Sequence, residues 1–143
     1  MITAIDSNVL IDILEPDPVY GPLSKEALKS CFTGGSVLAC EVVWAEVGTA
    51  YGHDIQGLVD ALDSMGIQFS ALSRDASLDA ARRWFDYRQR GGTRKRIAAD
   101  FLIGAHAMVQ CERLLTRDRG FFRDYFSNLE LFDPSEPDTE SDG

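Results

Sequence analysis

The chain has 143 residues, of which 14 are basic and 23 acidic, so its formal net charge is −9. This length suits a single domain, and a hydrophobic content of 45% is enough for a buried core, which excludes wholesale disorder. The acidic balance argues against a protein that coats nucleic acid through bulk positive charge, although a nuclease site can itself be built from carboxylates.

Short apolar segments alternate with amphipathic segments along the chain. The apolar pattern predicts strands at 2–5, 36–39, 67–72 and 113–116, and an edge strand at 129–132. The remaining periodic segments predict helices over 8–14, 22–32, 41–51, 55–65, 75–89, 96–110 and 119–126. Strands that alternate with helices in this way predict a parallel sheet with helices on both faces.

We expect one domain over residues 1–132 and an acidic tail over 133–143. The tail has five acids, no base and, from Pro134 on, no hydrophobic residue, so it is expected to be disordered. The N-terminal segment does not have the pattern of a signal peptide, and no apolar run has the length of a membrane span. Three widely spaced cysteines fit neither a disulfide framework nor a zinc site. Together these features predict a soluble, cytoplasmic protein that does not associate with membranes.

Two carboxylates follow predicted parallel strands. Asp6 comes directly after 2–5, and Asp118 follows 113–116 after one intervening arginine. The carboxyl ends of parallel strands form one edge of a sheet, and α/β folds bind their ligands at that edge. We therefore expect both acids to lie there.

Two further carboxylates interrupt the apolar face of a predicted helix. Glu46 has Val42 and Val43 one turn before it, and Asp100 has Ile103 one turn after it. Burying a carboxylate without a partner costs on the order of several kcal/mol. We therefore expect Glu46 and Asp100 to face a counter-charge inside the fold and not the solvent.

A counter-charge for all four acids can be supplied in two ways. Basic residues such as Arg117 or Arg94 could form structural salt bridges with them. Alternatively, the acids could share a divalent metal, because oxygen-only ligands suit Mg²⁺ or Mn²⁺, which bind through a few carboxylates and substrate phosphate. The metal explains all four acids together, and no Cys or His pair has zinc spacing.

Four segments of the chain match one known family. They are D-S-N-V-L-I-D at 6–12, W-A-E-V at 44–47, A-A-D-F-L-I-G-A-H-A at 98–107 and L-L-T-R-D-R-G-F-F at 114–122. In this order and spacing they resemble the PIN domain, and more narrowly the VapC toxins of toxin–antitoxin pairs. The resemblance spans residues 1 to about 132.

The resemblance implies a three-layer α/β/α fold, with a central, mostly parallel sheet of four to five strands flanked by helices. It also implies an endoribonuclease that depends on Mg²⁺ or Mn²⁺. The family's four acids, which would be the catalytic residues and metal ligands, match Asp6, Glu46, Asp100 and Asp118. The small hydroxyl positions beside those acids, which would orient ligands or water, match Ser7 and Thr116.

The resemblance further implies several partners. These are an RNA substrate, a second copy of the chain in a homodimer, and a cognate VapB-like antitoxin that blocks the site. With the antitoxin, the expected assembly is a heterotetramer or larger.

The positive charge is concentrated in one segment. Half of the basic side chains lie at 82–96, where Asp86 is the single acid. We expect this segment to contact RNA phosphates or an acidic part of the antitoxin, with Trp84, Phe85 or Tyr87 available to stack on bases or to join the core. The candidate contact residues are Arg90, Arg94, Lys95 and Arg96.

Three alternatives remain. A PIN-type nuclease that acts in RNA processing or on DNA would share the chemistry without being a toxin. A non-catalytic PIN-like module is disfavoured by the complete set of four acids. A phosphoacceptor receiver-like module would need an aspartate at the end of the third strand, and the segment 67–72 ends without one.

Overall fold

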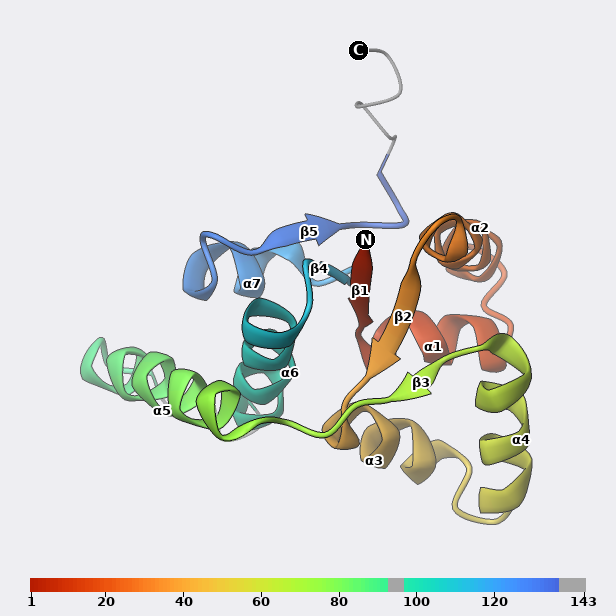
Figure 1. Cartoon of the computed structure of the whole chain (residues 1–143), viewed down its shortest axis with the longest axis horizontal. Helices are drawn as coiled ribbons and strands as arrows, with labels where there is room; N and C mark the ends of the chain where they lie inside the picture. The colour runs from red at the N-terminus through yellow and green to blue at the C-terminus, as the bar shows by residue number, and fades with distance from the viewer. Residues whose placement is uncertain (93–96, 137–143) are drawn as a thin grey trace.

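The computed structural model describes residues 1–92 and 97–136 and contains the expected alternation of strands and helices (Figure 1). The strands are β1 (Ile2–Ile5), β2 (Ser36–Ala39), β3 (Gln68–Phe69), β4 (Arg113–Leu115) and β5 (Glu130–Phe132). The helices are α1 (Ser7–Leu14), α2 (Tyr20–Phe32), α3 (Glu41–Ala50), α4 (Ile55–Met65), α5 (Arg74–Gln89), α6 (Ile97–Gln110) and α7 (Arg119–Tyr125).

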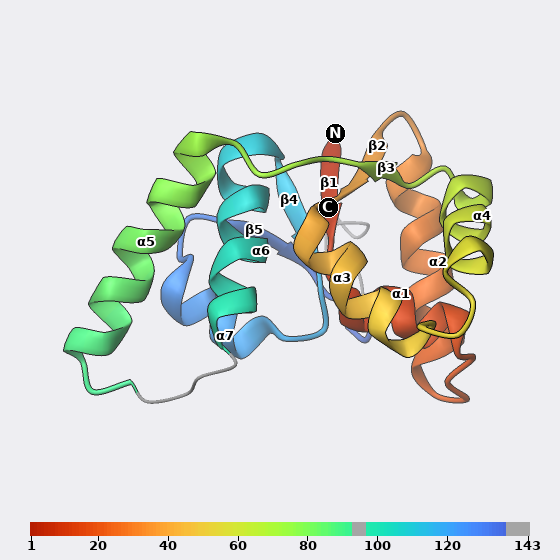
Figure 2. The same ribbon diagram turned by 90° about the horizontal axis from the view of Figure 1, so that it is seen from below.

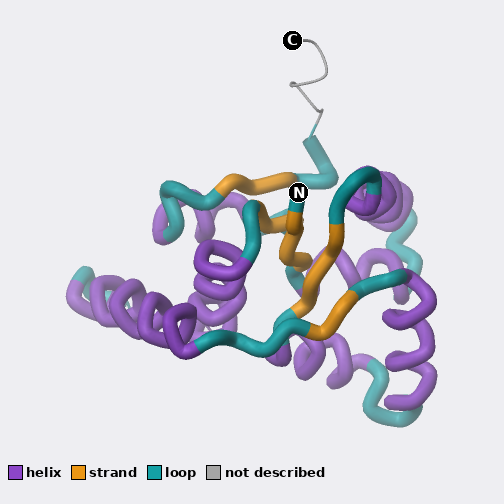
Figure 3. The backbone as a smooth tube through the Cα atoms, in the orientation of Figure 1, coloured by secondary structure: helices purple, strands orange, loops and turns teal. Residues whose placement is uncertain are grey.

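The five strands form one sheet in the order β3-β2-β1-β4-β5, and every neighbouring pair is parallel. Figure 3 shows the strands side by side with helices around them, and Figure 2 places α5, α6 and α7 on the side of β4 and β5. The predicted three-layer α/β/α fold is therefore confirmed. The receiver-like alternative is wrong, because a receiver has the strand order 2-1-3-4-5.

The third strand is shorter than the predicted segment 67–72. After the backbone N–H of Ser70 donates to the carbonyl of Ala39, the chain leaves the sheet and crosses to α5. Side chains from other elements hold the crossing segment: Glu41 at the start of α3 accepts from the Leu72 N–H at 2.9 Å, and Gln110 of α6 accepts from the Ser73 N–H at 2.9 Å. Hydrogen bonds from residues distant in the sequence therefore hold residues 72 and 73, where the prediction had a longer third strand.

Capping residues set several helix boundaries, some through a side chain and one through its backbone conformation. Ser73 accepts from the Ala76 N–H and begins α5, as expected from its position. Asp17 accepts from the N–H groups of Val19 and Tyr20, and α2 accordingly begins two residues before the predicted start. Gly66 ends α4 with a φ of 82°, a left-handed conformation that glycine adopts without steric cost.

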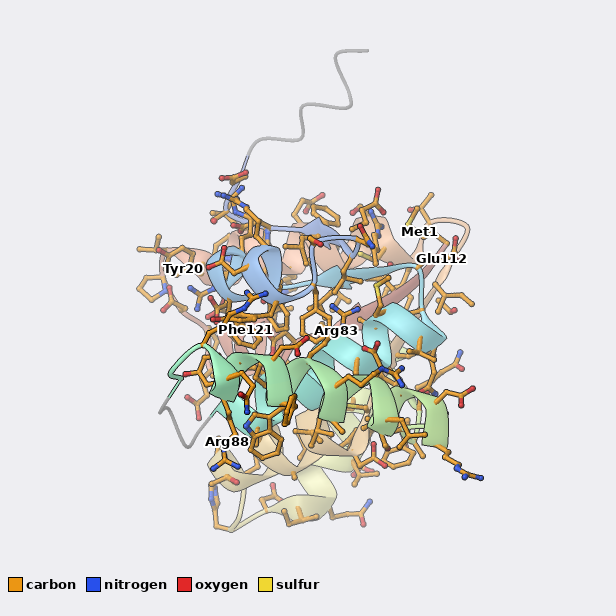
Figure 4. All side chains as sticks on the ribbon, turned by 90° about the vertical axis from the view of Figure 1, so that its left-hand side faces the viewer. Met1, Tyr20, Arg83, Arg88, Glu112 and Phe121 are labelled. Atoms are coloured by element: carbon orange, nitrogen blue, oxygen red, sulfur yellow. The ribbon has the colours of Figure 1, made fainter. Side chains whose placement is uncertain are left out.

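An aromatic cluster joins α5, α6 and α7. Phe101 of α6 is fully buried; the Trp84 ring stacks on it, and the Tyr87 ring meets it edge-on with centroids 5.6 Å apart. Of the three aromatic residues offered for base stacking, Trp84 and Tyr87 therefore belong to the core, and only Phe85 is exposed. Figure 4 views this side of the molecule, with Arg83 directed toward α7 and Arg88 directed away from it.

The beginning of the acidic tail is bound to the domain. Arg119 forms ion pairs with Asp133, at 2.9 Å, and with Glu136, and Pro134 is buried. The first part of the predicted tail, residues 133–136, therefore contacts the domain through Arg119, which supplies a counter-charge at the end of β5. The disorder of the tail stays a prediction. The rest of the predicted tail, 137–143, lies outside the described residues.

The cysteines and the length of the helices can also be compared with the sequence. Cys31, Cys40 and Cys111 are all free. Within the described ranges, no helix combines the length and the apolar character needed to span a bilayer.

Gly104 provides a test of this packing. A Cβ at Gly104 of α6 would lie 2.5 Å from ring carbons of Phe126, whose side chain is fully buried. We expect Gly104→Ala to lower the free energy of unfolding by roughly 1–3 kcal/mol, because overpacking outweighs the gain in helix propensity. Urea unfolding measures the change. Gly120→Ala in α7 is the control, since nothing lies within 4 Å of its Cβ, and there the expected change is neutral or stabilising; equal effects at both glycines would contradict the prediction.

Candidate active site

The site lies where β1 and β4 end side by side. Ile5 is paired with Leu115, and the backbone N–H of Asp6 donates to the carbonyl of Leu115 at 3.0 Å. The register therefore places Asp6 next to Thr116. The strands β2 and β3 are added on one side of β1, and β4 and β5 are added on the other side. The strand order therefore reverses at β1, and α/β folds bind ligands in the crevice at such a switch point.

Hydrogen bonds connect Asp6 to the β4–α7 loop. Asp6 is 4% exposed, and its Oδ2 accepts from the Thr116 hydroxyl at 2.8 Å. The same hydroxyl oxygen accepts from the backbone N–H of Asp118 at 3.0 Å. Thr116 thus fixes the backbone of Asp118 relative to the Asp6 carboxylate.

Ser7 connects Asp6 to α3. The backbone N–H of Ser7 donates to Oδ1 of Asp6 at 2.7 Å, which makes Asp6 the N-cap of α1. The Ser7 hydroxyl lies 2.9 Å from Oε1 of Glu46 and 3.4 Å from Oδ1 of Asp6. Ser7 and Thr116 therefore lie beside the acids, where the sequence predicted small hydroxyl residues.

The carboxylates in this cluster affect one another. Burial raises the pKa of Asp6 from 3.8 to about 6, and the carboxylates of Glu46 and Asp118 add to that rise in pKa. The hydrogen bonds from Thr116 and Ser7 lower the pKa of Asp6 but do not cancel the effect of burial. The site thus concentrates negative charge around one buried acid.

Glu46 is less buried than its sequence neighbours suggested. The buried face of α3 is centred on Val43 and Val47, and Glu46 lies at its border with an exposed side chain. Asp118 is exposed as well. The expectation that Glu46 faces the interior is therefore wrong, because the fully buried positions of this helix are Val43 and Val47 and Glu46 lies outside that face. Its contact with Ser7 nevertheless brings it to Asp6.

Asp100 lies in the first turn of α6 and is half-buried. Because α6 is the last helix of the crossover that leads into β4, its first turn lies at the carboxyl edge of the sheet (Figure 2). Asp100 therefore shares that edge with Asp6 and Asp118.

The salt-bridge alternative placed Arg117 against the four acids. In the structure, Arg117 binds Asp12 instead, with its Nε 2.6 Å from Oδ2 and its Nη2 3.0 Å from Oδ1. Within residues 1–92 and 97–136, none of the ion pairs involves Asp6, Glu46 or Asp118. The pairing with Arg117 is therefore wrong, while Arg94 lies outside the described residues.

Sequence reasoning missed two residues near the site. The Asn8 amide donates to Oδ2 of Asp6, and its carbonyl oxygen accepts from the backbone N–H of Arg117, both at 3.4 Å. Asp12 is 5% exposed and also accepts from the Ser24 hydroxyl. The sequence could have indicated Asp12, because it lies six residues after Asp6 in the short helix that Asp6 caps.

The last features to place are one histidine and the basic segment. His106 is buried and its Nε2 lies 3.0 Å from the Ser70 hydroxyl. Burial lowers the pKa of His106, and the carboxylate of Glu41 opposes that effect. Arg90 is exposed at the end of α5. Arg94, Lys95 and Arg96 lie outside the described residues.

The donor set fits a hard divalent cation. Among the side chains that the structure describes, no group of three or more His, Cys, Asp and Glu residues is arranged so that the group could hold a metal ion. Mg²⁺ does not require such a group, because it retains several waters and binds through one or two carboxylates plus substrate phosphates. A buried carboxylate beside two others, with no ion pair among the described residues, offers that kind of site.

The raised pKa of Asp6 predicts a stability effect in metal-free buffer. An acid whose pKa is higher in the folded than in the unfolded state destabilises the fold as pH rises from about 3.8 to about 6, and the full penalty remains above that range. We expect Asp6→Asn to raise stability by roughly 1–3 kcal/mol near pH 7, because asparagine still caps α1. Thermal melts in EDTA measure this. The difference should shrink toward pH 4, and a lower melting temperature for Asp6→Asn at pH 7 would refute the prediction.

Comparisons with known proteins agree with this fold. The family model described as "PIN domain" matches residues 3–126. A comparison with curated proteins found no significant match. Among solved structures, the chain resembles VapBC2 from Rickettsia felis bound to a DNA fragment from their promoter, with 19% identity, a TM-score of 0.74, and 93% of this chain and 98% of that chain covered.

Two further structures have the same fold. VapBC-1 from nontypeable Haemophilus influenzae is 16% identical with a TM-score of 0.74 over 95% of this chain and 100% of that chain. FitAcB from Neisseria gonorrhoeae is 21% identical with a TM-score of 0.70 over 96% and 100%. The family match, which covers nearly all of the folded residues, shows that this chain belongs to the PIN domain family.

Proposed function

We propose that the protein is a metal-dependent endoribonuclease that cleaves RNA phosphodiester bonds, acting as the toxin of a toxin–antitoxin pair. One observation carries the proposal: Asp6 is buried at the β1–β4 junction and is linked through Ser7 to Glu46 and through Thr116 to the backbone of Asp118. A fold needs no such concentration of carboxylates for stability, and burial raises the pKa of Asp6, as expected for an acid whose charge has no cation beside it.

In this proposal, Asp6, Glu46, Asp100 and Asp118 hold Mg²⁺ or Mn²⁺, directly or through water. The bound ion would supply Lewis-acid activation of a water and neutralise charge at the scissile phosphate. The Ser7 hydroxyl orients the Glu46 and Asp6 carboxylates, and the Thr116 hydroxyl sets the distance between Asp6 and the Asp118 backbone. Hydroxyl groups suit this role because they can donate to one carboxylate while accepting from a backbone N–H.

The partners are also part of the proposal. The structural relatives reported above are VapBC and FitAcB assemblies, and we infer by analogy that a VapB-like antitoxin covers this site in a heterotetramer or larger complex. A homodimer of the chain and a cytoplasmic location belong to the same inference. The basic side chains of 82–96, including the exposed Arg90, would contact RNA phosphates or an acidic antitoxin segment.

The metal-site assignment predicts the effect of two conservative substitutions. Asp6→Asn and Asp100→Asn should each lower Mg²⁺-dependent RNA cleavage at least about 100-fold, because each removes a charged ligand that acts in the transition state. Single-turnover cleavage of a labelled RNA pool, with circular dichroism to confirm the fold, measures this. Asp63→Asn, at an exposed acid of α4, is the matched control.

Cleavage by either site variant at the wild-type rate would contradict the assignment of these acids as metal ligands.

Mapping of new RNA 5′ ends after induced expression, with Asp6→Asn as the negative control, distinguishes a toxin from a processing nuclease. A toxin should arrest growth and produce a defined set of new ends, and a gene for its antitoxin should restore growth.

The basic segment predicts a salt-dependent RNA affinity. Replacing Arg94, Lys95 and Arg96 with Glu should weaken RNA binding and reduce the slope of log K against log salt by about 2, since each phosphate contact contributes about 0.7. Fluorescence anisotropy in EDTA at several salt concentrations measures the slope. Lys25→Glu with Lys29→Glu, at exposed positions of α2, controls for bulk charge. An unchanged slope in the triple variant would rule out phosphate contacts.

A further inference from the structure

Asp118 is flanked in the sequence by two arginines, and neither neutralises the candidate site. Arg119 is bound to Asp133 and Glu136. Arg117 is bound to Asp12 through two nitrogen–oxygen contacts of 2.6 and 3.0 Å. Both guanidinium groups are therefore directed to carboxylates outside the acid cluster.

Two residues, Asp12 and Tyr20, fix the position of the Arg117 guanidinium. Asp12 contributes both oxygens and is itself held by the Ser24 hydroxyl at 3.1 Å. The Tyr20 ring lies under the guanidinium carbon, with 4.0 Å to the ring centroid. These partners come from α1 and α2, so the arginine side chain is held against the helices and away from the β1–β4 junction.

The distance between Asp12 and Asp6 along α1 shows why it matters which carboxylate Arg117 binds. Asp12 lies six residues after Asp6, which places it about 9 Å farther along the helix axis. Without Asp12, the long side chain of Arg117 would have Asp118 as its sequence neighbour, and Thr116, the residue before Arg117, donates to the buried Asp6. Asp17 is a further carboxylate that acts on the guanidinium. An arginine readily forms two parallel hydrogen bonds to a carboxylate, so it would compete with a cation for the same oxygens.

We propose that Asp12 is a positioning residue that sequesters the Arg117 guanidinium and thereby keeps the carboxylates of the site open to a divalent cation. This inference rests on the proposed metal site. It gives the Asp12–Arg117 pair a role that a purely structural ion pair lacks: the pair controls how tightly the site binds metal.

The test compares two substitutions of the same arginine. Arg117→Lys keeps the positive charge but replaces the two-pronged contact with a single mobile ammonium, which Asp12 holds less firmly. Arg117→Gln removes the charge. We expect Arg117→Lys to bind Mg²⁺ at least about fivefold more weakly than Arg117→Gln, as measured by calorimetric titration with Mn²⁺ or Mg²⁺ alone and by the metal-induced rise in melting temperature. RNA cleavage should require a correspondingly higher Mg²⁺ concentration in the lysine variant.

A second pair of variants examines Asp12 itself. Asp12→Asn should weaken Mg²⁺ binding because Arg117 is released, and adding Arg117→Gln should restore it. As a matched control, Arg83→Lys and Arg83→Gln alter an arginine that is bound to Asp79 at 2.8 Å and should leave metal affinity unchanged.

The outcomes separate this inference from the proposed function. If the wild-type protein binds no Mg²⁺ or Mn²⁺, both fail. If the wild type binds metal but Arg117→Lys binds as tightly as Arg117→Gln or more tightly, only the sequestering role is overturned, and the ion pair is structural. If Asp12→Asn does not fold, the two Arg117 variants, which retain Asp12, still decide the question.

Discussion

The carboxylate of Asp6 at the β1–β4 junction is the constraint on which the rest of the site depends. The parallel register of these strands brings Asp6 beside Thr116, and the start of α1 supplies the Ser7 N–H to the other oxygen. Two strands, one helix start and one loop are thus fixed around a single buried acid. Burial raises the pKa of this acid, and in the proposed function a bound cation would offset the cost of its charge.

The overall charge of −9 described the function poorly, whereas the placement of the charges describes it well. Carboxylates gather at the carboxyl edge of the sheet, and the arginines beside them are bound by Asp12, Asp133 and Glu136. Much of the remaining positive charge lies on and after α5. In the proposed function, an anionic substrate would be attracted by these basic residues while the acid cluster would bind a cation.

The helix that carries Asp100 is held by contacts far from the site. Its Phe101 packs among the rings of α5 and α7, and Gly104 allows the ring of Phe126 to approach the helix backbone. At its other end, Gln110 holds the segment that crosses from β3 to α5. This packing explains the glycine at position 104 within the segment 98–107.

The sequence by itself determined the order of strands and helices, the parallel sheet and the family, because these follow from local periodicity and from motifs whose residues are close in the chain. It also placed Asp6 and Asp118 at the carboxyl edge of the sheet, since both follow parallel strands, and the family resemblance added Ser7 and Thr116 beside the acids. Only the tertiary structure decided that Glu46 is exposed, that β3 ends after two residues, that 133–136 is bound to Arg119, and that Arg117 pairs with Asp12. These features depend on which side chains from distant segments come within hydrogen-bonding reach, and that is fixed by packing between layers and not by spacing along the chain.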